Sequence, residues 1–416
     1  MTEKFRTDQL SKPIKIGNKE AKNRIFLNAM EGNDSDEEGN PSSKTIRRYK
    51  ELFEGDAGMI SSGALTITYE SRGRKYQESI MPRNREALKN LVEEMREVNE
   101  DPLFIFQLTH SGELSTPDFS KRVTVKELPG FGGELLTEED VRDIQDKFVR
   151  AARIAYECGA DGVDFKLCHG YLGSQILRPY NDRDWEFGGS WENRSKFAFE
   201  TFERMVDEVG DSDFLFGSKV SLWEGFPGGQ GTAGPDSAIM DLEEPLDLIK
   251  GLEKRGADFV IQSAGCPSIT LALTQPDARI PRDVYLHQTF QQRISEVVGS
   301  DMVVIGSGYS AFRNGDNRLQ AVKKEEASIP YWGNKCIEDG VTDMVAIGRQ
   351  SLADPKFPKK LLYGDQEDIN WCTTCDGCVE LLIRQENVGC TVHYEEYRKL
   401  LEEVRKEKGR IIEKRT

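Results

Sequence analysis

Four of the eight cysteines in this chain lie within nineteen residues near its C-terminal end. They are Cys372, Cys375, Cys378 and Cys390, and eleven residues separate the third from the fourth. Thiolates at this spacing can converge on one point, with a short helical stretch between the last two. A set of four thiolates is typical of zinc or of an iron–sulfur cluster. An iron–sulfur cluster would let the protein transfer electrons, whereas zinc would only crosslink and stabilise the chain.

The other four cysteines are scattered, at Cys158, Cys168, Cys266 and Cys336. We expect them to be small buried hydrophobic residues, although a functional role stays open for Cys168, which lies beside a candidate catalytic site. Clustered cysteines in a chain of this size indicate metal ligation rather than disulfides, and therefore a reducing compartment.

The charge and hydropathy of the chain exclude several classes of partner. Its 416 residues carry 56 Lys and Arg against 72 Asp and Glu, a net charge of −16. This balance argues against nucleic acid and against anionic membranes. No apolar run approaches the roughly 20 residues that cross a bilayer, and the polar N-terminus has no signal-peptide pattern. We therefore expect a cytoplasmic protein that binds neither nucleic acid nor membrane.

Eight short apolar runs alternate with longer amphipathic segments. The runs begin at residues 24, 57, 103, 162, 214, 258, 302 and 344. They are rich in Val, Ile, Phe and Leu without strict alternation, which predicts parallel strands covered on both faces. The helices expected between them cover 42–53, 84–98, 137–158, 192–209 and 242–255.

Eight strand–helix repeats over this length favour an α/β fold, the closed (β/α)₈ TIM barrel. The alternative is an open doubly wound sheet, although no GxGxxG motif follows the first strand. We expect the barrel over residues 1–365 and a separate cysteine-containing segment with a C-terminal helix over 366–416. Residues 307–333 are predicted to be a loop insertion at the barrel mouth, and the helix that begins at Glu395 to be a solvated surface helix.

In a barrel of this kind the active site lies at the carboxyl ends of the strands. The residues that follow the apolar runs are therefore the candidates for chemistry. After the last two runs, IGSG (305–308) offers small residues whose backbone N–H groups can approach an anion, and IGR (347–349) adds a guanidinium group. Together they predict a ligand that carries a phosphate.

Residues 169–197 resemble the Old Yellow Enzyme family of FMN oxidoreductases. The matching motifs are HGYL, NDR and GGSWENR. The opening KPIKIGNKEAKNRI, Gln107 with THSG, and the late GSG and GR motifs also fit, so the resemblance covers about residues 12 to 365. The four-cysteine run resembles the branch that includes 2,4-dienoyl-CoA reductase and trimethylamine dehydrogenase, whose members carry a [4Fe–4S] cluster beside FMN. The resemblance therefore implies that the four cysteines hold such a cluster.

The resemblance also implies which residues bind FMN. Residues after the first and second strands would lie under or near the flavin, Gln107 would hydrogen-bond its pyrimidine edge, and Lys219, where the family usually has Arg, would lie near its N1–C2=O edge. The late glycine motifs would hold the phosphate. The full implied set is Ala29, Met30, Gly63, Gln107, Lys219, Gly306, Ser307, Gly308, Gly348 and Arg349.

On the substrate side, the resemblance implies that Lys166 and His169 polarise a carbonyl group and that Tyr171 donates a proton. Hydride from flavin N5 would reach the β-carbon of an activated alkene, and the acid would protonate the α-carbon. Glu31 departs from the family, which often has a small hydroxyl or thiol there. A carboxylate beside the flavin would disfavour reduction unless it is protonated or paired.

The expected function is an FMN- and [4Fe–4S]-dependent oxidoreductase that reduces the C=C bond of an α,β-unsaturated carbonyl or carboxylic compound. No dinucleotide domain follows Cys390, so we expect a separate electron donor, such as a ferredoxin or a flavoprotein subunit. Direct reduction by NAD(P)H stays open, and so does a homo-oligomer. Two alternatives remain: an amine-dehydrogenase-like oxidation that drains electrons through the cluster, and a zinc-stapled barrel that acts only as a binding subunit.

Overall fold

Eight parallel strands close into a barrel in this computed structural model, which describes residues 4–127, 132–277, 279–316, 323–364 and 366–409. Each strand pairs with the next along the chain, and the last pairs with the first, so the expected TIM barrel is confirmed. All eight predicted strands are present. They are β3 (Ile25–Leu27), β4 (Met59–Thr66), β5 (Leu103–Thr109), β8 (Gly162–Leu167), β9 (Leu215–Ser221), β10 (Phe259–Ser263), β11 (Val303–Gly306) and β12 (Met344–Ile347).

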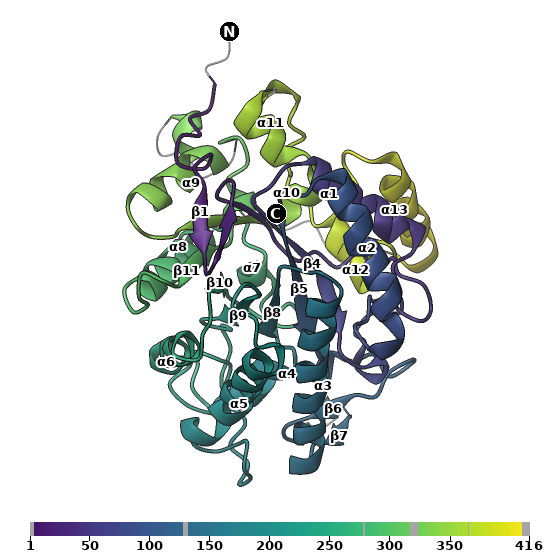
Figure 1. Ribbon diagram of the computed structural model, residues 1–416, viewed down its shortest axis with the longest axis vertical. Coiled ribbons are helices and arrows are strands. Elements are labelled where there is room, and N and C mark those ends of the chain that lie inside the picture. Colours follow the sequence, from purple (N-terminus) through teal and green to yellow (C-terminus); the bar gives the residue numbers. More distant parts are fainter. Residues whose placement is uncertain (1–3, 128–131, 278, 317–322, 365, 410–416) are drawn as a thin grey trace.

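Helices surround the barrel (Figure 1). The five predicted helices are confirmed as α1 (Ser43–Glu54), α2 (Arg85–Val98), α3 (Glu138–Glu157), α5 (Trp191–Val209) and α6 (Glu243–Glu253). The sequence analysis missed two of comparable length, α8 (Pro281–Ser295) and α9 (Ile329–Glu338), and the short helices α4 (Leu172–Leu177), α7 (Leu271–Thr274), α10 (Arg349–Ala353) and α11 (Phe357–Tyr363). The buried face of α8 contains the polar residues Asp283, His287 and Gln291, so the apolar periodicity of the sequence is weak there.

The expected loop insertion at residues 307–333 needs a correction. Its last residues belong to α9, which begins at Ile329 after the N-cap Ser328 and covers the barrel between β11 and β12. Ser328 accepts a hydrogen bond from the Tyr331 N–H, a standard N-cap interaction. Residues 317–322 of this segment lie outside the described residues.

The end of the barrel opposite the carboxyl ends of the strands is closed by a hairpin. It consists of β1 (Ile14–Ile16) and β2 (Lys19–Ala21), which pair antiparallel. Ile16 and Ala21 are buried in one cluster with strand residues such as Phe26 and Phe259. Apolar packing fills this end of the barrel, so a ligand cavity has room only at the other end.

The C-terminal segment packs onto the side of the barrel. Its helices are α12 (Gly377–Ile383) and α13 (Glu395–Lys408), and α13 lies beside α1 (Figure 1), where Arg47 hydrogen-bonds Glu396. As predicted, α13 is a surface helix, but one face of it is buried. Leu401 and Val404 lie on that face, because the helix is amphipathic and its Arg405 pairs with the buried Glu380 of α12.

Two further expectations can be compared with the structure. The four scattered cysteines are all buried, as predicted. Among the described residues no helix combines the length and the apolar character needed to cross a membrane.

Candidate functional site

A cavity of about 500 Å³ opens at the carboxyl ends of the barrel strands. This volume lies in the range of sites for cofactors and drug-sized ligands. Of the barrel residues singled out from the sequence, all but Gly63 and Gly306 line it. The lining set is Ala29, Met30, Gln107, Lys166, His169, Tyr171, Lys219, Ser307, Gly308, Gly348 and Arg349.

Gly63 and Gly306 lie just outside this lining. A Cβ on Gly63 would come 3.7 Å from the Met30 carbonyl oxygen, so this glycine lies directly behind the loop that follows β3. A Cβ on Gly306 would meet the Gln291 side chain of α8 at 2.2 Å. Gly306 is therefore explained by close packing between β11 and α8, without any ligand.

Two hydrogen-bonded pairs hold polar side chains in the cavity. Lys219 Nζ donates to Asn28 Oδ1 at 2.7 Å, and Gln107 Nε2 donates to Asp164 Oδ2 at 2.6 Å. Burial lowers the pKa of Lys219 and raises the pKa of Asp164. The sequence analysis did not single out Asn28 or Asp164. The signal for Asp164 was a lone carboxylate within an otherwise apolar run.

The residues expected to hold a phosphate are partly committed to protein groups. The Ser307 N–H donates to Gln262 Oε1 at 3.2 Å. Arg349 pairs with Asp376 at 2.9 Å and also donates to a backbone carbonyl. At Gly308 the φ angle is +94°, and a Cβ would come 3.0 Å from the His287 ring, so glycine keeps the backbone open to the cavity.

Four polar side chains of the cavity lie close together: Glu31, Arg74, Lys166 and Tyr171. The Tyr171 hydroxyl donates to Glu31 Oε1 at 2.7 Å. Lys166 Nζ lies 3.8 Å from the same oxygen and 3.5 Å from the centroid of the Tyr171 ring. Arg74 Nε lies 3.5 Å from Glu31 Oε2. The carboxylate that departs from the family pattern is therefore paired, as the flavin would require, and Arg74 is a site residue that sequence reasoning missed.

Burial sets the protonation of the two predicted acid–base residues. Together with the Glu31 carboxylate, it holds the pKa of Tyr171 well above its usual value of 10.0. Burial and the nearby Lys219 hold the pKa of His169 well below 6.5, so its imidazole is neutral at pH 7. His169 has a φ of +64° and its Nε2 lies 2.7 Å from Ser263 Oγ, which fixes the ring.

The structure brings the four late cysteines to one small hollow. Cys372, Cys375, Cys378 and Cys390 line it together with Arg349 and Asp376. Arg349 therefore lines both this hollow and the barrel cavity, so its side chain is shared between the two sites. In the parts of the chain that the structure describes, no three His, Cys, Asp or Glu side chains are grouped tightly enough for a single metal ion.

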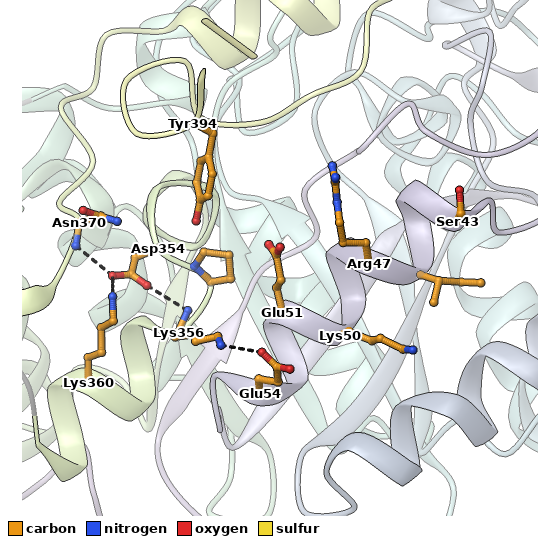
Figure 2. Close-up of a pocket in the computed structure, with 12 residues that line it drawn as sticks. Ser43, Arg47, Lys50, Glu51, Glu54, Asp354, Lys356, Lys360, Asn370 and Tyr394 are labelled. Carbon is orange, nitrogen blue, oxygen red and sulfur yellow. Dashed lines mark hydrogen bonds and ion pairs between the residues drawn. The ribbon is translucent and has the colours of Figure 1, made fainter. Parts of the chain in front are cut away.

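A second hollow of about 550 Å³ lies on the surface between α1 and the C-terminal segment (Figure 2). Four of its charged side chains form two ion pairs: Lys356 with Glu54 at 2.6 Å and Lys360 with Asp354 at 2.7 Å. The barrel cavity differs, because Glu31 Oε2 and Arg74 Nε are buried there without a hydrogen-bond partner, and such groups favour a polar ligand.

The fold and site define a (β/α)₈ barrel protein with a polar, cofactor-sized cavity at the carboxyl ends of its strands. The chain belongs to the NADH:flavin oxidoreductase / NADH oxidase family, whose model matches residues 9–260.

The sequence identity to individual relatives is low. The chain is 28% identical over 392 residues to an NADH oxidase of Thermoanaerobacter brockii, covering 91% of this chain and 55% of that protein. It is 27% identical over 401 residues to a cinnamate reductase of Clostridium sporogenes, covering 92% and 57%. The structure of a 2-naphthoyl-CoA reductase complex has the same fold, with a TM-score of 0.75 and 21% identity over 94% of this chain and 58% of that one. The chain thus spans little more than half the length of these proteins.

Proposed function

We propose that this chain binds FMN in the barrel cavity and reduces the C=C bond of an α,β-unsaturated carbonyl or carboxylic compound. The observation that carries the proposal is the convergence of Lys166, His169 and Tyr171 on the cavity that Gln107 and Lys219 also line. Family membership supports the flavin, and the likeness to a cinnamate reductase supports the reaction.

The residues of the cavity fit FMN. Ala29 and Met30 would lie under the flavin with Gly63 behind them, Gln107 would reach its pyrimidine edge, and Lys219 would place a cation where charge builds on reduction. The phosphate would lie against Gly308, Gly348 and Arg349, with Gly306 and Ser307 shaping that end. Bound FMN would supply hydride chemistry.

On the substrate side, neutral His169 and cationic Lys166 can both donate hydrogen bonds to a carbonyl oxygen. The Tyr171 hydroxyl can supply a proton to carbon, with Glu31 as its hydrogen-bonded neighbour. Because burial and Glu31 raise the pKa of Tyr171, proton donation requires that the tyrosinate formed be reprotonated at once. The lysine ammonium over its ring can stabilise that anion.

We further propose that the four late cysteines hold a [4Fe–4S] cluster. Four thiols around one hollow are the donor set such a cluster takes. On this proposal, residues 1–365 form the FMN barrel and 366–416 the iron–sulfur segment of a cytoplasmic protein. Electrons would come from a ferredoxin or a flavoprotein subunit, or from NAD(P)H directly.

One observation favours a second function. Glu31 places a carboxylate in the cavity, which could bind a cationic amine and so support an amine-dehydrogenase-like oxidation. Anaerobic spectra separate the two directions. The proposal predicts that reduced protein is reoxidised by unsaturated carbonyl or carboxylic compounds and that oxidised protein is not bleached by amines. Bleaching by amines without reoxidation by any unsaturated compound would contradict it.

A further inference from the structure

We infer that Arg74 and Lys166 form an anion subsite in the barrel cavity that selects an unsaturated carboxylic acid as the substrate. This inference rests on the proposed function and narrows it from carbonyl and carboxylic compounds to carboxylates. Arg74 follows the 3₁₀ helix η1 (Tyr69–Ser71), in the long connection between β4 and α2, and reaches the cavity beside Glu31.

The first argument is that both cations have unused donors. Arg74 Nε is buried and has no hydrogen-bond partner, whereas its Nη1 is committed to the Gly73 carbonyl at 2.8 Å. The Lys166 side chain is only 4% exposed, and its ammonium makes no hydrogen bond to any described residue. A buried charged donor without a hydrogen bond, as Arg74 Nε is, is costly. A bound carboxylate, with two acceptor oxygens, would satisfy both groups.

The second argument is the balance of charge. Two cations, Arg74 and Lys166, face one carboxylate, Glu31, so this end of the cavity carries a net charge of +1. An incoming amine would meet two like charges, whereas an incoming carboxylate completes a neutral set of four. The other two cations of the lining already have protein partners, Lys219 with Asn28 and Arg349 with Asp376.

The third argument is the apolar wall of the same cavity. Apolar side chains of the cavity lining include three from the C-terminal segment and two from connections between strands of the barrel. They are Val379, Leu382 and Ile383, and Leu114 and Leu271. A ligand that suits both the cations and this apolar lining therefore has a carboxylate joined to an apolar conjugated body.

The test is a binding measurement on oxidised holoenzyme, read from the change in the flavin absorbance. The probes share one skeleton: cinnamate, its neutral amide, and the corresponding amine. We expect the wild-type protein to bind cinnamate about tenfold or more tightly than the amide, as a charge-assisted hydrogen bond would give, and the amine most weakly.

In R74Q the preference for the acid over the amide should shrink about tenfold, and R74K should keep part of it. Arg282→Gln, at a side chain that is 82% exposed, is the matched control and should keep the full preference.

Equal affinity of the wild-type protein for acid and amide would overturn the inference, and so would tightest binding of the amine. Because these comparisons use the wild-type protein, they hold even if R74Q fails to fold. Turnover separates this inference from the proposed function. If neutral enones are reduced as fast as unsaturated acids, the proposed reaction stands and the inference of an anion subsite is rejected. If the acid binds preferentially but no alkene is reduced, the inference of an anion subsite stands and the proposed reaction is rejected.

Discussion

Tyr171 is the residue on which the proposed proton transfer depends. Its hydroxyl points at Glu31 rather than at solvent, and the Lys166 ammonium lies over its ring. Lys166, His169 and Tyr171 were candidates because they lie at the end of an apolar run, and a barrel brings such residues together. Their roles were implied by the resemblance to the family. It did not identify Arg74, because a residue in a long connection has no fixed position relative to the strand ends.

Tyr171→Phe should lower the rate of alkene reduction by about 10²-fold or more, since general acids contribute about 10²–10⁴-fold. The ring and its contact with Lys166 remain in this variant, so substrate affinity should change less than turnover. Steady-state rates and binding titrations measure the two effects. Unchanged turnover would show that another group supplies the proton.

A buried histidine predicts how stability depends on pH. Burial lowers the pKa of His287 from 6.5 to about 4. Its Nε2 lies 2.8 Å from the Leu273 carbonyl oxygen, which can only accept, so this nitrogen carries the proton of the neutral ring. Between pH 6.5 and about 4 the unfolded chain binds more protons than the folded one. The free energy of unfolding should therefore fall as the pH is lowered through this window.

His287→Gln should flatten that dependence, because the glutamine side chain does not titrate. Urea unfolding of both proteins at several pH values between 4 and 7 gives the comparison. A variant that loses stability on acidification as steeply as the wild-type protein would contradict the assignment.

At the scale of elements, the sequence contained enough information for the barrel strands and for the helices with strong start signals. Thr137 and Ser190 are residues of the type that caps helix N-termini, and both accept hydrogen bonds from their helices. The helix α8 was missed because its apolar period is weak, so its position is fixed by packing against β10 and β11 rather than by local pattern. The fold was therefore more predictable than the contacts between its loops.

The cap of α3 gives a prediction at this scale. Thr137 Oγ1 accepts the Asp140 N–H at 3.1 Å, and the Asp140 carboxylate accepts the Thr137 N–H at 2.9 Å. Thr137→Ala should lower the free energy of unfolding by about 1 kcal/mol. Thr137→Ser keeps the hydroxyl and should cost much less. Equal losses in the two variants, measured by urea unfolding, would show that the methyl group rather than the cap is responsible.

At the scale of the whole molecule, the C-terminal segment joins two sites. Its cysteines surround a hollow next to Arg349, and its helix α12 supplies part of the wall of the barrel cavity. The segment is attached to the barrel through α10, where the Cys372 N–H donates to Gln350 Oε1 at 2.9 Å and the Gln350 amide donates to the Asn370 carbonyl at 2.8 Å. This arrangement places the proposed cluster beside the proposed flavin site.

The cluster proposal predicts that Cys375→Ala loses most of its bound iron and acid-labile sulfide, because one of four ligands is removed. The barrel cavity does not include Cys375, so FMN should still bind. Cys158→Ala is the control. That cysteine is buried and its thiol donates to the Arg85 carbonyl, so the variant should keep its iron. Full iron content in Cys375→Ala would contradict the ligand assignment.

The central claim is that the barrel cavity of this chain holds FMN. The most direct measurement is the visible absorption spectrum of protein purified without oxygen, followed by identification of the cofactor released on denaturation. We predict flavin bands over a broad iron–sulfur absorbance, and FMN in the released fraction. A colourless protein that contains zinc and no flavin would contradict the account.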